Sequence, residues 1–305
     1  MLGVIERRRP LALEDDMSTE RRAPERSGRV VAVVMLGLVA VTALTVAAPR
    51  LQSPKAAPEE LKAYEAFRAW ITSQPQEVQK ASDEEVFRRY AGELQKNGLT
   101  EAAAAQTIAL LKRTGDGAEI ERWNVILTSP KASFNRMPNA FLVEVTKGMK
   151  PGRSLDVGMG QGRNTIFLAQ QGWDSVGFDP ADRAVASAQE DAKKLGVKIT
   201  THVARDEDFD WGTSAWDLIV LSYVGARDLN TKVVQALRPG GMVVVEGFHR
   251  DATKTRPIGG GVVFDTNELL QLFSGLRVVR YDDTTAIGDF GQDQTRVVRL
   301  AAVKP

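Results

Sequence analysis

The chain has 305 residues and a formal net charge of +1, which allows one large domain with appendages. This balance of charge disfavours a nucleic-acid-binding protein, since it supplies no basic field. The chain has no cysteine, which excludes disulfides and thiolate-based metal sites, and its two histidines, His202 and His249, make a multi-histidine site unlikely. We therefore expect no metal.

The N-terminus contains a long uncharged segment. Residues 1–29 are charged and expected to be disordered, whereas residues 30–48 are all apolar or small. At about 1.5 Å per residue, the second segment spans about 28 Å, close to the hydrocarbon thickness of a bilayer. It is interpreted as a single-pass membrane anchor, with a cleaved signal segment and export as the alternative. The side of the membrane on which the rest of the chain lies is left open.

A helical region is predicted over residues 59–134, after a proline-containing linker at 49–58. Apolar residues recur at helical spacing, and Ser82 begins a capping-box pattern. Thr100 is expected to cap a further helix that Gly115 ends, with another helix around Ile120. This region is interpreted as a cap or lid on the domain that follows.

From Pro138 the pattern alternates between strands and helices, which predicts a doubly wound, Rossmann-like α/β domain over residues 135–305. A Gly- and Asp-rich loop is expected at 282–294, and a helix at 181–195. The sheet is expected to have seven strands, near 153–157, 175–178, 198–203, 217–222, 241–247, 277–281 and 295–303.

Glycines alternate in the connection that follows the first strand, at Gly158, Gly160 and Gly162. Such a loop allows a ligand to contact the backbone, and the next helix, expected at 165–171, presents its N–H groups there. Asp156 places a carboxylate at the strand end, suited to a ligand amine. Asp179 ends the second strand about 20 residues past the loop, where an acid can accept hydrogen bonds from ribose hydroxyls.

The dinucleotide fingerprint G-x-G-x-x-G needs a glycine or alanine at position 163, where this chain has Arg163. An NAD-dependent oxidoreductase is therefore disfavoured. Arg163 could pair with Asp156 or with an acidic substrate, although an exposed arginine is at least as plausible. Asn164 is expected to cap the next helix.

Four motifs in order resemble those of class I S-adenosylmethionine-dependent methyltransferases: Asp156-Val157-Gly158-Met159-Gly160-Gln161-Gly162, then Asp179, then the strand Ala215-Trp216-Asp217-Leu218-Ile219-Val220, then the turn Leu237-Arg238-Pro239-Gly240-Gly241. The resemblance covers roughly residues 135–305. It implies methyl transfer from S-adenosylmethionine to an unidentified, small-molecule acceptor, and an antiparallel last strand beside the fifth. A protein that binds the cofactor as a sensor or scaffold, without transfer activity, is the alternative.

The resemblance also implies roles for residues at the strand ends. Asp156, Gly158, Gly160 and Gly162 would hold the amino-acid end of the cofactor, and Asp179 its ribose. Asp206, after the third strand, is the first choice among several acids for the adenine amino group. After the fourth strand, Ser222 is placed with the cofactor and Tyr223 in the acceptor pocket, while His249, at the end of the fifth, could remove a proton from the acceptor.

Overall fold

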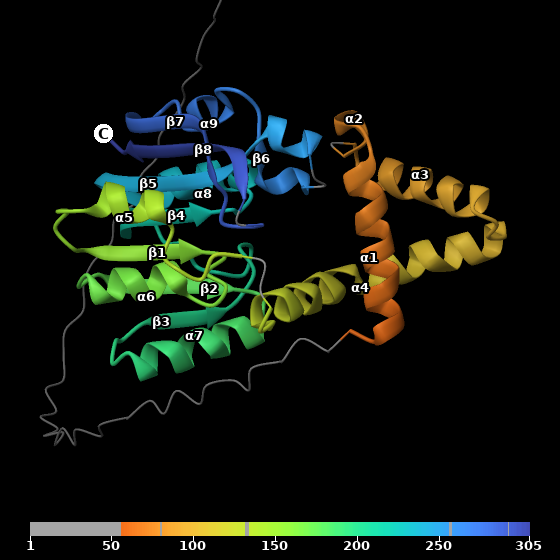
Figure 1. Cartoon of the computed structure of the whole chain (residues 1–305), viewed down its shortest axis with the longest axis horizontal. Helices are drawn as coiled ribbons and strands as arrows, with labels where there is room; N and C mark the ends of the chain where they lie inside the picture. Colours follow the sequence, from red (N-terminus) through yellow and green to blue (C-terminus); the bar gives the residue numbers. More distant parts are fainter. Residues whose placement is uncertain (1–55, 80, 132–133, 256–257, 292) are drawn as a thin grey trace, which may run out of the picture. The chain divides into compact units, whose positions relative to one another are not determined.

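A helical region precedes a mixed sheet in the computed structural model, which describes residues 56–305 apart from 80, 132–133, 256–257 and 292 (Figure 1). The described residues belong to one compact unit. The anchor predicted at residues 30–48 and the tail before it lie outside the described residues. Among the described helices, none combines the length and the apolar character that crossing a membrane requires.

The helical region consists of four helices. Their bounds are α1 Pro58–Ser73, α2 Gln76–Gln79, α3 Asp83–Lys96 and α4 Glu101–Thr128. Ser82 and Thr100 cap α3 and α4 as predicted, since each hydroxyl accepts a hydrogen bond from the backbone N–H three residues on. Aromatic rings join α1 to α3, with the Phe67 and Phe87 centroids 5.3 Å apart.

The predicted end of a helix at Gly115 is wrong, because α4 continues through this residue for 28 residues in all. An isolated glycine within a helix costs only about 1 kcal/mol relative to alanine. At this position α1 packs across α4, and a Cβ on Gly115 would lie 3.8 Å from the Tyr64 ring. Tertiary packing therefore outweighs the local preference, and the two helices expected here are one.

The sheet follows the order β3-β2-β1-β4-β5-β8-β7, with β6 paired to β5. Seven strands were predicted and eight are found, because the two-residue β6 was missed. The five strands β1 to β5 pair in parallel along the sheet, while β8 lies antiparallel between β5 and β7, as the resemblance implied. Their bounds are β1 Arg153–Val157, β2 Asp174–Asp179, β3 Thr200–Val203, β4 Trp216–Ser222, β5 Leu237–His249, β6 Val263–Phe264, β7 Arg277–Ile287 and β8 Gln294–Val303.

Helices cover both faces of this sheet. Alternate residues of β4 divide between two apolar clusters: Ile219 and Leu221 pack with α8 and α9, while Leu218 and Val220 pack with α5 and α6. The helices are α5 Ala140–Thr146, α6 Arg163–Gln170, α7 Asp182–Lys194, α8 Ala226–Ala236 and α9 Glu268–Leu272. Since β1, β2 and β4 are parallel, their carboxyl ends meet at one edge, where ligands bind in open α/β sheets.

Candidate functional site

The glycine loop between β1 and α6 turns through left-handed backbone. Gly158, Gly160 and Gly162 have φ values of +64°, +53° and +74°, conformations that other residues adopt only with strain. The side chain of Met159 points into the protein, where a Cβ on Gly177 of β2 would come within 2.5 Å of its sulfur. Gly177 thus provides the space that lets a large side chain occupy this loop.

Asp179 lies at the end of β2, and the residue is 7% exposed. One oxygen accepts a hydrogen bond from the Gly160 N–H at 2.9 Å, and the other accepts from the Ala181 N–H at 2.8 Å. Burial raises the pKa of this carboxyl, and the two N–H groups oppose that shift. Since each carboxylate oxygen can accept more than one hydrogen bond, Asp179 fixes the loop and still has capacity for a ligand hydroxyl.

Asp156 stabilises the start of α6 from within the protein. Its Oδ2 atom accepts hydrogen bonds from the Thr165 N–H at 3.1 Å and from the Thr165 hydroxyl at 2.7 Å, and the residue is 2% exposed. Burial raises the pKa of Asp156 to about 6. Asp156 thus holds the first turn of α6, and its predicted contact with a ligand amine stays a prediction.

Two expectations for the start of α6 are wrong. The helix begins at Arg163 rather than at 165, and Asn164 does not cap it, since the N-cap residue is Gly162. Asn164 is instead buried in the first turn, where its Oδ1 atom accepts a hydrogen bond from the Asn139 N–H at 2.9 Å. A side-chain cap was the sequence-based expectation because Asn is common there; the left-handed Gly162 fills that position instead.

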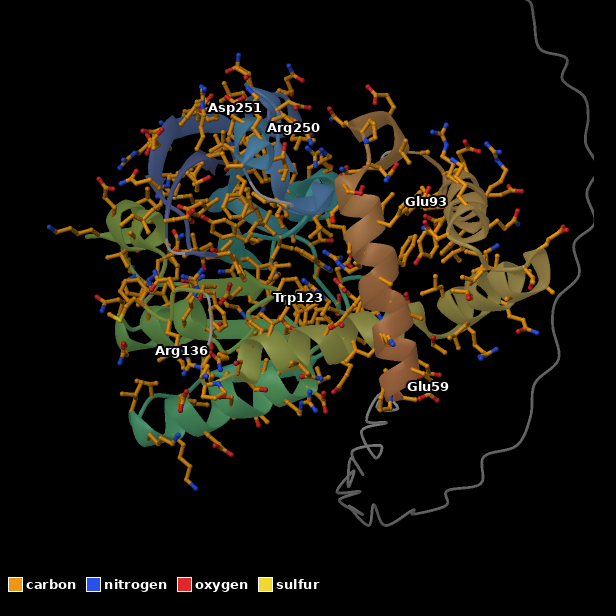
Figure 2. The ribbon with its side chains drawn as sticks, turned by 45° about the vertical axis from the view of Figure 1, so that its right-hand side comes forward. Glu59, Glu93, Trp123, Arg136, Arg250 and Asp251 are labelled. Atoms are coloured by element: carbon orange, nitrogen blue, oxygen red, sulfur yellow. The ribbon has the colours of Figure 1, made fainter. Side chains whose placement is uncertain are left out.

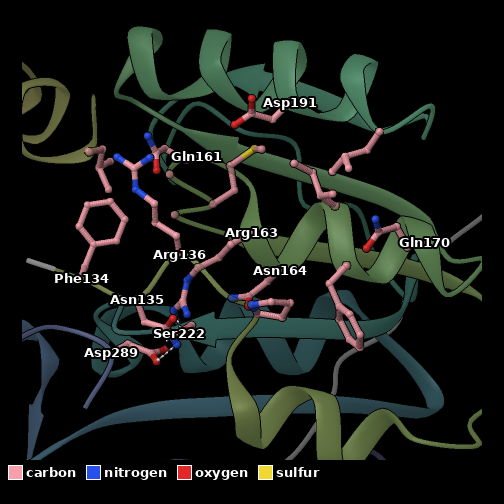
Figure 3. Close-up of a pocket in the computed structure, with 18 of the residues that line it drawn as sticks. Phe134, Asn135, Arg136, Gln161, Arg163, Asn164, Gln170, Asp191, Ser222 and Asp289 are labelled. Atoms are coloured by element: carbon pink, nitrogen blue, oxygen red, sulfur yellow. Dashed lines mark hydrogen bonds and ion pairs between the residues drawn. The ribbon is translucent and has the colours of Figure 1, made fainter. Parts of the chain in front are cut away.

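Arg163 pairs with an acid that the sequence analysis did not identify. Its NH2 atom donates to Asp289 Oδ2 at 2.6 Å and to Ser222 Oγ at 3.1 Å (Figure 3). Its NH1 atom donates to the Met137 carbonyl at 3.0 Å. It makes no hydrogen bond with Asp156. Asp289 lies between β7 and β8, in the segment noted from the sequence only as a Gly- and Asp-rich loop.

Asp289 is the centre of a buried polar network that connects this loop to the sheet. Its carboxylate also accepts from the side-chain amides of Asn139 at 2.8 Å and Asn135 at 3.1 Å. Its N–H donates to the Tyr223 hydroxyl, which in turn donates to Glu246 on β5 at 2.8 Å. Composition offered a weak signal for this site, a run of Asp and Gly, but not the partners.

Tyr223 follows β4 with a φ of +58°, one of three non-glycine residues with positive φ among those described. Its ring packs against Phe248 and Phe290, with centroids 4.8 and 5.4 Å away. Burial raises the pKa of the Tyr223 hydroxyl, and the negative charges of Glu246 and Asp289 raise it further. These effects favour the protonated, neutral form of Tyr223.

Two cavities meet at Gly158. The loop cavity, of about 410 Å³, lies beside the glycine loop and is also lined by Arg163, Ser222 and Asp289. The strand-end cavity, of about 370 Å³, lies across the ends of β1 and β2 and the segment after β3, with Asp206 in its wall. Asp206 Oδ2 pairs there with Lys232 at 3.2 Å. The predicted cofactor residues Gly158, Ser222 and Asp206 are thus brought to adjoining cavities.

A third cavity, the cap cavity, has a volume of about 680 Å³ and lies between helices α1 and α4 and the edge of the sheet. Tyr223, which the sequence analysis placed in an acceptor pocket, contributes to the wall of this cavity. Phe290 lines both this cavity and the loop cavity. Its lining includes Arg68, Glu119, Arg122, Trp123, Phe248, Ile258 and Val262.

His249 does not reach these cavities. It is 4% exposed, its Nδ1 atom accepts from the Asp251 N–H at 3.1 Å, and its Nε2 atom lies 3.0 Å from the Thr266 hydroxyl. None of the three cavities has His249 in its lining. These contacts assign His249 to the support of the segment after β5, and His202 is an exposed residue of β3.

The residues around Gly158 fit S-adenosylmethionine. A carboxylate at the end of β2 suits ribose hydroxyls, and a loop of left-handed glycines permits close approach of a ligand to the backbone. The two cavities on either side of Gly158 match a ligand with an adenosine part and an amino-acid part. Asp206 lies on the strand-end side, while Ser222 and Arg163 lie on the loop side.

Comparison with known proteins identifies the domain. Residues 155–241 match the family model described as a methyltransferase domain. A probable S-adenosyl-L-methionine-dependent methyltransferase, TehB, of Haemophilus influenzae is 22% identical over 47% of this chain and 52% of its own length. Hemagglutinin 1 of Eikenella corrodens is 24% identical over 52% of this chain and 55% of its own length. The chain thus spans about half the length of these curated relatives.

A solved structure shares the fold. It comes from work on the conversion of a disulfide bond into a thioacetal group during echinomycin biosynthesis, and it is 18% identical with a TM-score of 0.51. The similarity covers 61% of this chain and 93% of that one. The recognition of a class I S-adenosylmethionine-dependent methyltransferase domain with a Rossmann-like sheet is confirmed.

Proposed function

We propose that this chain, which carries a class I S-adenosylmethionine-dependent methyltransferase domain, transfers a methyl group from that cofactor to a small-molecule acceptor. The observation that carries the proposal is the hydrogen bond between Asp179 and the Gly160 N–H, which joins the end of β2 to the glycine loop. It sets an acid and the backbone of the glycine loop side by side. Gly158 of this loop lines both the loop cavity and the strand-end cavity.

Different residues of this chain would bind different parts of the cofactor. Asp179 would accept hydrogen bonds from the ribose, and Asp206 would lie at the adenine in the strand-end cavity. Gly158 and Gly160 would contact the amino-acid part, with Ser222 and Arg163 on the loop side. When bound, the cofactor supplies a methyl group on a sulfonium: the acceptor forms a bond to the methyl carbon while the carbon–sulfur bond breaks and its electron pair stays on sulfur.

The protein's contribution to this reaction is alignment. The sulfonium is already activated, so the rate depends on holding the acceptor in line with the methyl group and excluding water. The cap cavity is the proposed place of the acceptor, because Phe290 lines both it and the loop cavity, and Tyr223 follows Ser222 directly. Tyr223, whose protonated form is favoured, would line the acceptor with its ring, and His249 has no part in the proposal.

The test is a titration of the full-length chain with S-adenosylmethionine, S-adenosylhomocysteine and NAD. We expect both adenosyl ligands to bind and NAD not to. Asp179→Ala should weaken binding at least tenfold, since charge-assisted hydrogen bonds are worth about 1.5–3 kcal/mol. Asp208→Ala, which removes an exposed acid, is the control. Tight NAD binding without any response to S-adenosylhomocysteine would refute the proposal, and binding without turnover across an acceptor screen would favour a sensor or scaffold.

We also propose that residues 30–48 hold the protein in a membrane. The support is the sequence alone: 19 residues without charge, flanked by arginines. A signal segment removed on export is the alternative, and the side of the membrane that the methyltransferase domain faces is not assigned.

A further inference from the structure

The cap cavity has an apolar wall and a charged wall. The apolar wall comes from the sheet edge and the segment after it. Tyr223 and Phe248 belong there to one buried cluster, and the partly buried side chains packed against it include Ile258, Val262 and Phe290. The charged wall comes from the helices: Arg68 lies on α1, and Glu119 and Arg122 lie on α4. Trp123, labelled in Figure 2, also lies on α4 and contributes to the lining of the cavity.

The Glu119 carboxylate lies near both arginines, but of these two only Arg68 donates a hydrogen bond to it. Its Oε1 atom accepts hydrogen bonds from Arg68 at 3.3 Å and from the Trp123 indole at 2.9 Å. Its Oε2 atom lies 3.9 Å from Arg122 NH1, too far for a hydrogen bond, and both of these atoms are buried without a hydrogen-bond partner. Arg122 therefore presents a buried donor that the protein leaves unsatisfied.

The acids of the lining leave this donor unsatisfied. Two guanidinium groups lie beside Glu119, whose side chain is 30% exposed, while the other acid in the lining, Glu65, is exposed on α1. Burial and the proximity of Arg68 lower the pKa of Arg122, but an arginine remains protonated at neutral pH. The Arg122 guanidinium also lies over the Trp123 ring, 5.1 Å from its centroid, which orients its plane. A ligand oxyanion would satisfy this buried donor.

We propose that the methyl acceptor is an amphipathic organic anion whose oxyanion pairs with Arg122 while its apolar body lies against Phe248 and Val262. The proposal rests on the proposed function, because it places the acceptor in the cap cavity. A volume of about 680 Å³ is within the range typical of small-molecule sites. A planar guanidinium binds a carboxylate or a phosphate through paired hydrogen bonds, so the shared chemistry is that of an oxyanion.

The test uses four probes with one apolar body: 2-naphthylacetate, 2-naphthyl phosphate, 2-naphthylacetamide and 2-naphthylethylamine. Each is titrated calorimetrically into the full-length chain in the presence of S-adenosylhomocysteine. We expect at least one anionic probe to bind tenfold or more tightly than the amide and the amine. Whether the carboxylate or the phosphate binds better identifies which oxyanion the cavity accepts.

Three variants test whether Arg122 is the residue that causes the preference for anionic probes. Arg122→Gln should bring the anionic probes to the affinity of the amide, whereas Arg122→Lys should retain part of the preference for anions. Arg113→Gln removes an exposed arginine from the same helix and should leave all four affinities unchanged. All variants should bind S-adenosylhomocysteine as the unmodified chain does, since Arg122 lines neither cavity at Gly158.

Two results would overturn the proposal: equal affinity of the unmodified chain for the amide and both anions, or an anion preference that survives Arg122→Gln. The first does not depend on whether any variant folds. Absence of S-adenosylhomocysteine binding would instead be a failure of the proposed function. Binding of that ligand without discrimination among the probes would refute only the assignment of an anionic acceptor.

Discussion

Replacing Asp289 by alanine is expected to destabilise the fold strongly, although the residue lies in a loop. Its carboxylate accepts hydrogen bonds from Arg163, Asn139 and Asn135, and the side chains of Arg163 and Asp289 are 15% and 8% exposed. Removing one partner of a buried ion pair typically costs about 3–5 kcal/mol, because the remaining charge loses its compensation. We expect Asp289→Ala to lower the free energy of unfolding by about this amount.

A double-mutant cycle separates the ion pair from the rest of the network. Arg163→Met should also be destabilising, but the double variant should lose less than the sum of the single losses, by about 1–3 kcal/mol, since no uncompensated charge remains. Urea unfolding of the chain without cofactor, followed by circular dichroism, measures these values. Asp208→Ala, at an exposed acid, is the matched control and should change stability by less than about 0.5 kcal/mol.

The same variants report on the site. Because Arg163 and Asp289 both line the loop cavity, Asp289→Ala should also weaken binding of S-adenosylhomocysteine, measured well below the unfolding transition. Losses under about 0.5 kcal/mol in both single variants, adding without coupling in the double, would refute the assignment of a buried, interdependent pair.

Three further results are expected. Burial raises the pKa of Asp156 from 3.8 to about 6, so the native state holds this proton more tightly than the unfolded state does. The free energy of unfolding should therefore fall as pH rises from about 4 to about 6, by on the order of 3 kcal/mol relative to Asp156→Asn. Parallel pH profiles of the unmodified chain and of Asp156→Asn would contradict this. Gly177→Ala should lower the free energy of unfolding by about 1–3 kcal/mol, since its Cβ would meet the Met159 sulfur at 2.5 Å. Gly92→Ala lies in open space on α3 and should raise it by about 0.5–1 kcal/mol in the same urea assay. Full-length protein should remain in the membrane fraction through carbonate and high-salt washes, because salt does not weaken apolar insertion; a mature N-terminus near Ala48 would show a cleaved signal instead.

Strands with strong local patterns were predicted well, and polar strand extensions were not. The fourth strand was predicted at 217–222 and is β4 Trp216–Ser222, which contains a buried apolar run from Leu218 to Leu221. In contrast, the loop expected at 282–294 is mostly strand, since β7 continues to Ile287 and β8 begins at Gln294. The polar residues there read as a loop, but cross-strand pairing, including the ion pair of Arg296 with Asp283 at 2.7 Å, keeps them in the sheet.

The candidate site also could be predicted only in part. Gly158, Asp179 and Ser222 could be selected from the sequence because loop and strand ends follow one another at a recognisable spacing. The partners of Arg163 could not, because Asp289 is 126 residues away and meets it only through the pairing of β7 with β8. Spacing also places Asp156 beside the loop, which makes its contact with a ligand a prediction, but spacing did not reveal its hydrogen bonds to Thr165.

The family match informs about the cofactor and not about the acceptor. Gly158, Asp179, Asp206 and Ser222 all lie within residues 155–241, the region that matches the methyltransferase model. Of the residues that line the cap cavity, Tyr223 alone lies within that region; the others come from the helices before it or from the chain after it. Relatives that match this region can therefore differ in the cap cavity, where the acceptor is proposed to bind. The charges of α1 and α4 and the apolar wall opposite them are the basis for that proposal.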